Sequence, residues 1–336
     1  MKEPFELHTP SVFAISSPLQ VLCAVAAIRQ LEINDFRVAV CYAKGDARNE
    51  QLWSILDYFK MYDRVLMPIS KFNLFLYRLK SMIHRNNQYK RLFIGDFRGA
   101  YDLILGSSYV SDGSNIVYLD DGLVTVSFLK DIITEPMDEI FKNFLNKLAV
   151  RRKFELNKNL LTIYGDLKNP KYVVKPLNLG YVISSNENRD VIKDVYIVGT
   201  TVDRYCSPIG LSFARFIEGL EKVFVQIRKE YPCDTLTYVP HGRDVSLYAK
   251  EMCERYGCLF IRPQLTVEME LLKQNASPKV VYGFTSSALY NIKKMFPETR
   301  VINIMFECPK DNVFYQEYLM LSEYYLQNGI ELLMLD

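Results

Sequence analysis

The sequence predicts an α/β protein with two Rossmann-like domains that face a central cleft. Short β-branched segments alternate with amphipathic segments of helix length along most of the chain, a pattern typical of parallel sheets. The length of 336 residues suits two domains of ~150 residues each. Hydrophobic residues make up 49% of the chain, which is enough to fill two cores.

The first half of the chain contains the segments of one such domain. Pro18 suits the first turn of a helix, so we expect a helix to follow the first strand directly. The expected strands are residues 12–16, 37–42, 64–67, 91–94, 102–105 and 116–119, and the expected helices are residues 18–31, 49–60 and 73–84.

The second half repeats the scheme. The expected strands are residues 195–198, 235–239, 259–261, 280–282 and 301–304, and the expected helices are residues 211–230, 245–256, 266–272 and 286–295. Residues 168–190 are rich in Asn, Lys, Pro, Gly and Ser, so we expect the linker there. We therefore predict domains at residues 1–175 and 190–312, followed by a helical segment at 313–336 with its helix at 314–327.

Charge and cysteine content exclude several classes of protein. Lys and Arg number 41 against 39 Asp and Glu, so we expect no nucleic-acid partner. The seven cysteines contain no pair spaced as in a zinc site, so we expect reduced, mostly buried thiols and no metal. The apolar run at residues 12–15 is too short for the core of a signal peptide, so we expect none, and no stretch approaches ~20 uninterrupted apolar residues. We expect a cytoplasmic protein.

The segment Asp120-Asp121-Gly122 follows a predicted strand, where parallel sheets present their functional groups. An ionised Asp can accept a proton from a hydroxyl nucleophile. Asp-Gly is also a common turn signal. The sequence leaves a catalytic base and a plain turn as alternatives.

His241 lies in the segment Pro240-His241-Gly242-Arg243, between a predicted strand and a predicted helix. With Arg243 and the helix N-terminus, it would offer a cationic, proton-donating environment to a phosphate. The alternative is that Asp244 caps the helix and the segment is a turn.

Two further strand ends carry groups suited to a phosphate. Gly199, followed by Thr200, would let a ligand approach the backbone. Thr285, Ser286 and Ser287 precede a predicted helix, where hydroxyl and N–H groups suit an anion, although Ser and Thr are also ordinary helix caps. The glycine patterns of dinucleotide-binding domains and P-loop ATPases are absent, which disfavours both classes.

The order of these motifs resembles that of the bacterial sialyltransferases, in particular the lipooligosaccharide sialyltransferases and the capsular polysialyltransferases. An acidic pair with glycine comes first, a histidine with proline second and a Ser-Ser pair third. The opening Ser17-Pro18-Leu19-Gln20 is also similar to the start of that group. Here proline precedes His241, whereas the family pattern is His-Pro.

The resemblance implies a GT-B-like fold and an inverting, metal-independent transfer of a nonulosonic acid (sialic, pseudaminic or legionaminic acid). The donor would be a CMP-activated sugar bound by the C-terminal domain. The acceptor would be a hydroxyl of a cell-surface glycan or glycolipid on the N-terminal side, in lipooligosaccharide or capsule synthesis. Asp120 matches the family's base, with Asp121 as the alternative if the turn is registered differently. The implied donor-binding residues are Gly199, Thr200, Pro240, His241, Gly242, Arg243, Thr285, Ser286 and Ser287, and the acceptor-side residues are Ser17, Pro18 and Gln20.

Three other functions remain open from the sequence. The first is transfer of Kdo from CMP-Kdo. The second is a metal-dependent transferase that uses a nucleotide-diphosphate sugar and binds the metal through Asp120 and Asp121. The third is a nucleotide- or glycan-binding protein without catalysis.

Residues 71–91 combine six basic residues with apolar ones and contain no acidic residue. A basic amphipathic helix suits an anionic lipid surface, so we expect peripheral contact with the inner face of the cytoplasmic membrane. The alternative is a core-facing stripe with a solvated basic face. The basic residues are Lys71, Arg78, Lys80, Arg85, Lys90 and Arg91, and a second cluster comprises Lys142, Lys147, Arg151, Arg152 and Lys153.

Overall fold

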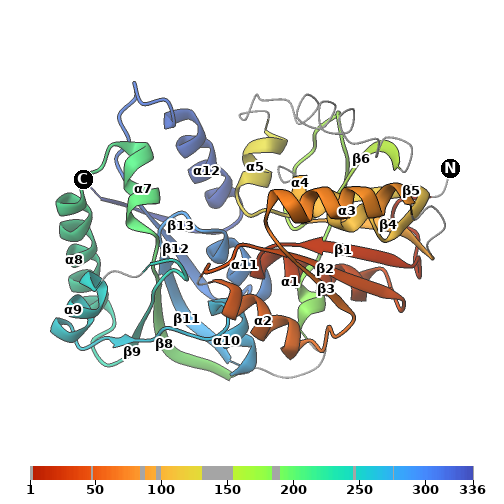
Figure 1. Ribbon diagram of the computed structural model, residues 1–336. Coiled ribbons are helices and arrows are strands. Elements are labelled where there is room, and N and C mark those ends of the chain that lie inside the picture. The colour runs from red at the N-terminus through yellow and green to blue at the C-terminus, as the bar shows by residue number, and fades with distance from the viewer. Residues whose placement is uncertain are drawn as a thin grey trace. The chain divides into compact units, whose positions relative to one another are not determined.

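The computed structural model describes residues 3–46, 48–83, 88–95, 100–130, 154–183, 190–244, 247–274 and 276–335. The chain divides into two compact units, Met1–Ser184 and Ser185–Asp336. Each unit is a parallel β-sheet with helices on both faces (Figure 1). The prediction of two Rossmann-like α/β domains is confirmed.

The first domain is built on a seven-stranded parallel sheet in the order β3-β2-β1-β4-β5-β6-β7. Its strands are β1 (Ser11–Ile15), β2 (Phe36–Tyr42), β3 (Arg64–Pro68), β4 (Tyr89–Ile94), β5 (Val110–Tyr118), β6 (Phe154–Thr162) and β7 (Val173–Pro176). Its helices are α1 (Pro18–Gln30), α2 (Arg48–Tyr58), α3 (Lys71–Ile83), α4 (Ala100–Ser107) and α5 (Val124–Leu129), with a short 3₁₀ helix, η2 (Leu179–Val182).

The central strand β1 is buried along its whole length, as expected of a strand with helices on both sides. Its continuous apolar run, rather than an alternating one, follows from that burial. Helix α1 begins directly after it, with Pro18 in its first turn and the Ser17 side chain accepting the Gln20 N–H at 3.4 Å. Ser17 and Pro18 thus fix where α1 begins, and they place Gln20 at the carboxyl edge of the sheet.

The second domain has a six-stranded parallel sheet in the order β10-β9-β8-β11-β12-β13. Its strands are β8 (Asp190–Val198), β9 (Thr235–Val239), β10 (Leu259–Phe260), β11 (Ala276–Gly283), β12 (Arg300–Phe306) and β13 (Glu331–Leu335). Its helices are α7 (Val202–Ile209), α8 (Phe213–Glu230), α9 (Tyr248–Arg255), α10 (Val267–Lys273), α11 (Ser287–Met295) and α12 (Tyr315–Gln327).

Helices α8 and α9 cover one face of this sheet, and α10 and α11 lie on the other (Figure 1). The buried face of α8 contributes Phe216, whose ring lies 5.1 Å from that of Phe284. A Cβ at Gly219 would come within 2.4 Å of the Phe306 ring, so α8 needs glycine there to pack against β12. This packing fixes the ends of β11 and β12, which carry polar groups described below.

Several elements differ from the predictions. Residues 102–105 lie in helix α4 rather than in a strand. This eight-residue helix packs between α3 and the sheet, so its apolar run is buried as a strand's would be. Strand β7 lies within the predicted linker and is the edge strand of the first sheet. Strand β13 lies within the C-terminal segment expected to be helical and pairs with β12. Helix α9 begins at Tyr248, three residues after the predicted start.

Five of the seven cysteines are buried, and all seven are free thiols, as predicted. Within the described ranges, no helix combines the length and the hydropathy that a membrane span requires.

Candidate active site

Two polar clusters lie at the carboxyl ends of the strands, one in each domain. The first surrounds Asp120 and Asp121, which follow β5. Tyr118 of β5 pairs with Leu160 of β6, so the acidic pair comes level with Thr162 at the end of β6. The Asp-Asp-Gly segment therefore lies at the sheet edge where the sequence places it.

Asp120 is completely buried. One carboxylate oxygen accepts a hydrogen bond from the Thr162 hydroxyl, and the other accepts the Ile163 N–H at 2.8 Å. The Cys23 thiol lies 3.9 Å from the second oxygen. Burial raises the pKa of Asp120 to about 7, and the hydrogen bonds from Thr162 and Ile163 oppose that rise. Asp120 is therefore a carboxyl group that can exchange a proton near neutral pH inside the domain.

Asp121 is only half-buried. Its Oδ1 accepts a hydrogen bond from Gln20 Nε2 at 3.3 Å, and its backbone N–H donates to Thr125 Oγ1 at 3.1 Å. Gly122 follows with a φ of +68°, a conformation that favours glycine. The turn that the sequence offered as one alternative is present, and the Asp121 carboxylate beside it is partly open to solvent.

The Gln20 amide is held in one orientation. Its Oε1 accepts hydrogen bonds from the Ser16 N–H at 2.7 Å and from Ser16 Oγ at 3.2 Å, which leaves Nε2 to face Asp121. A Cβ at Gly95 would lie 2.5 Å from the Gln20 side chain, so glycine at the end of β4 makes room for this amide. Gln20 therefore positions the Asp121 carboxylate.

The second cluster lies at the carboxyl ends of β8, β9 and β11. Val198 pairs with Val239 on one side and with Gly283 on the other, so the segments that follow these strands begin level with one another. The strand ends that carry Gly199, Pro240 and the residues after Gly283 therefore converge at one edge of the sheet. Gly199 donates its N–H to the Val239 carbonyl at 2.8 Å, and a Cβ there would meet the Tyr238 hydroxyl at 2.4 Å.

His241 is held through its Nδ1 atom. The Thr201 hydroxyl lies 2.9 Å from Nδ1, and the Arg243 N–H donates to it at 3.1 Å. Because Nδ1 accepts the Arg243 N–H, the neutral imidazole carries its proton on Nε2. His241 is therefore oriented to donate from Nε2.

Asp244 does not cap α9, contrary to the alternative left open by the sequence. The N-cap position is Leu247, and Asp244 accepts a hydrogen bond from the Tyr248 hydroxyl at 3.3 Å. The Asp244 N–H donates to the His241 carbonyl at 2.8 Å, and Arg262 donates to the Asp244 carbonyl. These bonds close the His241 loop into a defined turn. In it Pro240 is buried, whereas Gly242 and Arg243 are half-buried.

Helix α11 begins after β11, which is separated from β9 and its His241 loop by the single strand β8. Ser286 is its N-cap, and the Ser286 hydroxyl accepts the Ala288 N–H at 3.3 Å. Thr285 has a φ of +36°, and its N–H donates to Asn303 Oδ1 at 2.6 Å. Asn303 is fully buried in β12, and its Nδ2 has no hydrogen-bond partner among the described residues. The Ser286 hydroxyl is thus used in capping, and Ser287 begins the helix.

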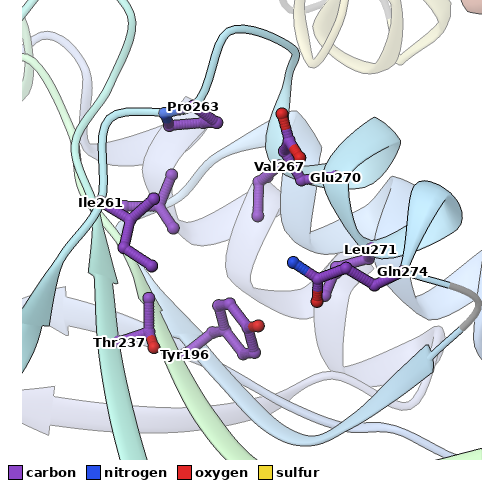
Figure 2. A pocket seen from close by; sticks show the side chains of 9 residues that line it. Tyr196, Thr237, Ile261, Pro263, Val267, Glu270, Leu271 and Gln274 are labelled. Carbon is purple, nitrogen blue, oxygen red and sulfur yellow. The ribbon is translucent and has the colours of Figure 1, made fainter.

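A pocket of about 130 Å³ lies between β8, β9, the segment after β10 and helix α10 (Figure 2). Val239 lines it and immediately precedes Pro240. Its walls are apolar at Val239, Ile261, Pro263, Val267 and Leu271 and polar at Tyr196, Thr237, Glu270 and Gln274. Figure 2 shows the Tyr196 ring and the Gln274 amide directed toward the same space.

Sequence reasoning missed several residues of these clusters. Thr162 and Cys23 support Asp120, and Thr201 rather than Thr200 contacts His241. Asn303 had a signal in the sequence, because it is a single polar residue inside the apolar run of β12. Across the described residues, no group of three or more His, Cys, Asp or Glu side chains gathers where a metal ion would bind.

No protein-family model matches this chain, and no curated protein matches it either. Solved structures do share its fold. An α/β-galactoside α-2,3-sialyltransferase from the marine bacterium Photobacterium phosphoreum is 14% identical, with a TM-score of 0.54 over 96% of this chain and 98% of that one. A 2,6-sialyltransferase from Photobacterium sp. JT-ISH-224, solved with CMP and lactose, is 13% identical, with a TM-score of 0.56 over 96% and 78%.

A putative UDP-N-acetylglucosamine 2-epimerase from Listeria monocytogenes is 10% identical, with a TM-score of 0.54 over 96% of this chain and 90% of that one. At such identities the likeness concerns the fold alone, and it spans both domains. The chain thus has the GT-B-like fold that the sequence predicts.

Proposed function

We propose that this protein is an inverting glycosyltransferase that moves a nonulosonic acid from a CMP-activated donor to a glycan hydroxyl. The observation that carries the proposal is the pair Asp120 and Asp121 at the carboxyl edge of the first sheet. One carboxyl group is buried with a pKa near neutrality, and the other is partly open and held by Gln20. Such a pair is suited to take a proton from a hydroxyl group.

Asp121 is the base in this proposal, and Gln20 holds its carboxylate. Asp120 is fully buried, so an acceptor hydroxyl cannot reach it. This favours Asp121 as the base over Asp120, which the family pattern implies. As the acceptor oxygen attacks the anomeric carbon, its proton passes to Asp121 and the bond between that carbon and the phosphate oxygen breaks. CMP leaves with the bonding electrons, and a single displacement inverts the configuration.

The second cluster is the proposed donor site. His241 Nε2–H would donate to the leaving phosphate, and Arg243 would add positive charge. The N-terminus of α11, with Thr285 and Ser287, would supply further donors. The backbone around the phosphate would be shaped by Gly199, Thr200, Pro240 and Gly242. A monophosphate leaving group needs less charge compensation than a diphosphate, so we propose that no metal ion is required.

The pocket between β8, β9 and α10 supports a pyrimidine nucleotide. Its volume of about 130 Å³ is close to that of an apolar cavity that accommodates one six-membered ring. The Gln274 amide and the Tyr196 and Thr237 hydroxyls would supply polar contacts to the edge of the ring.

The proposal is tested by incubating the protein with CMP-activated sialic, pseudaminic and legionaminic acids, with CMP-Kdo, and with UDP-sugars. Free nucleotide is measured with and without a lactose-type acceptor, in the presence and absence of EDTA. Release of CMP that depends on the acceptor and survives EDTA supports the proposal. CMP-Kdo as the sole donor would favour the Kdo alternative, and EDTA-sensitive turnover of UDP-sugars would favour the diphosphate-sugar alternative. Binding of CMP without turnover of any donor would favour a non-catalytic protein.

The acceptor in this proposal is a glycan or glycolipid used in lipooligosaccharide or capsule synthesis. A lipid-linked acceptor would bring the enzyme to the inner face of the cytoplasmic membrane. A matched pair of acceptors, one soluble and one carried on a lipid, tests this point by comparing the two values of kcat/KM.

A further inference from the structure

Helix α3 of the first domain carries apolar side chains on two faces. One face packs against α4. The other presents Phe72, Phe75, Leu76 and Leu79, whose spacing of three, four and seven residues places them on one side of the helix. These four side chains, the α3 outer face, are 69%, 56%, 43% and 41% exposed. Large apolar side chains gathered in this way mark an interaction surface.

We propose that the α3 outer face docks this protein on an anionic lipid bilayer. Helices that lie in a membrane interface insert Phe and Leu side chains at the boundary between headgroups and acyl chains and keep Lys and Arg beside the phosphates. Helix α3 has this composition, with Lys71, Arg78 and Lys80 and no acidic residue. Figure 1 shows α3 beside α4 on one face of the first sheet.

The basic residues contribute less than the sequence suggested. Lys80 donates to the Tyr109 hydroxyl at 2.9 Å and lies 4.3 Å from the centre of the Tyr109 ring, so its charge is directed to its own domain. Arg91 is buried. Lys71 is exposed. Arg85 and the second cluster at residues 142–153 lie outside the described residues. Binding should therefore depend on the apolar side chains first and on charge second.

The size of the face favours a membrane over a second copy of the chain. Two Phe and two Leu side chains at these exposures present on the order of 400 Å². A stable dimer buries about 800 Å² on each partner. A bilayer needs no matching surface, because the side chains enter it individually. The absence of acidic residues from α3 adds complementarity to anionic headgroups.

The test is flotation of the full chain with phosphatidylcholine vesicles that contain or lack phosphatidylglycerol. We expect the wild type to float with the anionic vesicles and the F72Q/F75Q variant to lose at least about tenfold in partitioning. Because both side chains are exposed, the variant should fold, which thermal melting checks. The matched control is F213Q/F314Q, which removes two exposed phenylalanines of the second domain (55% and 44% exposed) and should bind as the wild type does.

Two measurements separate the outcomes. A Phe75→Trp variant should shift its fluorescence to the blue on adding vesicles, beyond any change in wild type, which contains a single tryptophan. Lys71→Glu should weaken binding to anionic vesicles only. The proposal is overturned if the wild type binds no vesicle, if F72Q/F75Q binds normally, or if the control loses as much. It is also overturned if F72Q/F75Q changes the sedimenting mass of the protein and leaves flotation unaltered. The test uses no sugar donor, so its outcome is independent of the proposed transfer reaction.

Discussion

The Gln20 side chain donates to the Asp121 carboxylate at 3.3 Å, although the two residues are 101 positions apart in the chain. Gln20 stands in the first turn of α1 and Asp121 follows β5, so the contact joins two strand ends of the first sheet. The neighbouring Asp120 turns inward to Thr162. Two adjacent carboxyl groups of one motif therefore have different surroundings, which allows them to be separated experimentally.

The Asp121→Asn variant should lower kcat by about 10²–10⁴-fold, because the amide has no basic oxygen of comparable strength. The affinity for CMP should stay near the wild-type value, because the nucleotide site proposed here lies in the other domain. Steady-state kinetics on a soluble acceptor and calorimetry with CMP measure the two effects. A strong loss of kcat in Asp120→Asn with none in Asp121→Asn would restore Asp120 as the base.

Asp120 should make stability depend on pH. Its pKa rises from an ordinary value of 3.8 to about 7 on folding, so between these values the folded protein binds more protons than the unfolded chain. The free energy of unfolding should therefore fall as pH rises through this window. Asp120→Asn, which holds no titratable proton, should flatten that dependence. Melting temperatures at about pH 5 and pH 7.5 measure it, with the exposed Asp112→Asn as the control that should keep the wild-type slope.

Thr201 should affect the affinity for CMP, because its hydroxyl contacts His241. Thr201→Val keeps the shape of the side chain but removes the hydroxyl that lies 2.9 Å from Nδ1, so the imidazole loses this contact. We expect the Kd for CMP to rise by about tenfold, the size of one hydrogen bond. Thr201→Ser keeps the hydroxyl and should retain tight binding. Equal affinities for the Val variant and the wild type would remove His241 from the phosphate site.

Asn303 should support CMP binding by holding the loop that precedes α11. Its Oδ1 accepts the Thr285 N–H and so holds Thr285 at a φ of +36°. Asn303→Leu should weaken CMP binding by more than about tenfold, because the loop before Ser286 would relax to an ordinary φ. Asn303→Asp keeps the acceptor oxygen and should retain more affinity than the Leu variant. Calorimetry of all three proteins decides, and a Leu variant that binds as the wild type does would show that the loop keeps its shape without this contact.

Arg91 should be important for the stability of the first domain. It is buried, and it donates to Ser11 Oγ at 3.0 Å and to the Glu6 carbonyl at 2.9 Å. Arg91→Met should lower the free energy of unfolding by about 2–4 kcal/mol, because the carbonyl groups of the N-terminal segment lose a charged donor. Urea unfolding measures this, and Lys90→Met, at the exposed neighbouring position, should change stability by less than about 1 kcal/mol. Similar losses in both variants would argue against an anchoring role for Arg91.

Strand β1 could be predicted from its continuous apolar run, because a strand that is buried on both faces needs apolar side chains on both. Residues 102–105 looked like a strand for the same reason, since a short apolar run has no periodicity that distinguishes it from a buried helix. Strand β6 reads FELNKNLLT, whose central polar residues obscure the pattern. Asp120, Asp121 and His241 could be identified as candidate site residues because they directly follow predicted strands. The different surroundings of the two Asp residues could not be predicted, because Thr162 and Ile163, which surround Asp120, come some forty residues later.

Strand β13 is also a protective element. It pairs in parallel with β12 from Ile302 to Phe306, and every residue of β12 after Arg300 is buried. Deletion of residues 331–336 would turn that apolar strand into an open edge whose N–H and C=O groups could pair with another molecule. A chain that lacks residues 331–336 would therefore be prone to self-association through β12. Concentration-dependent light scattering after such a deletion would report the loss of this cover directly, even while both polar clusters remained in place.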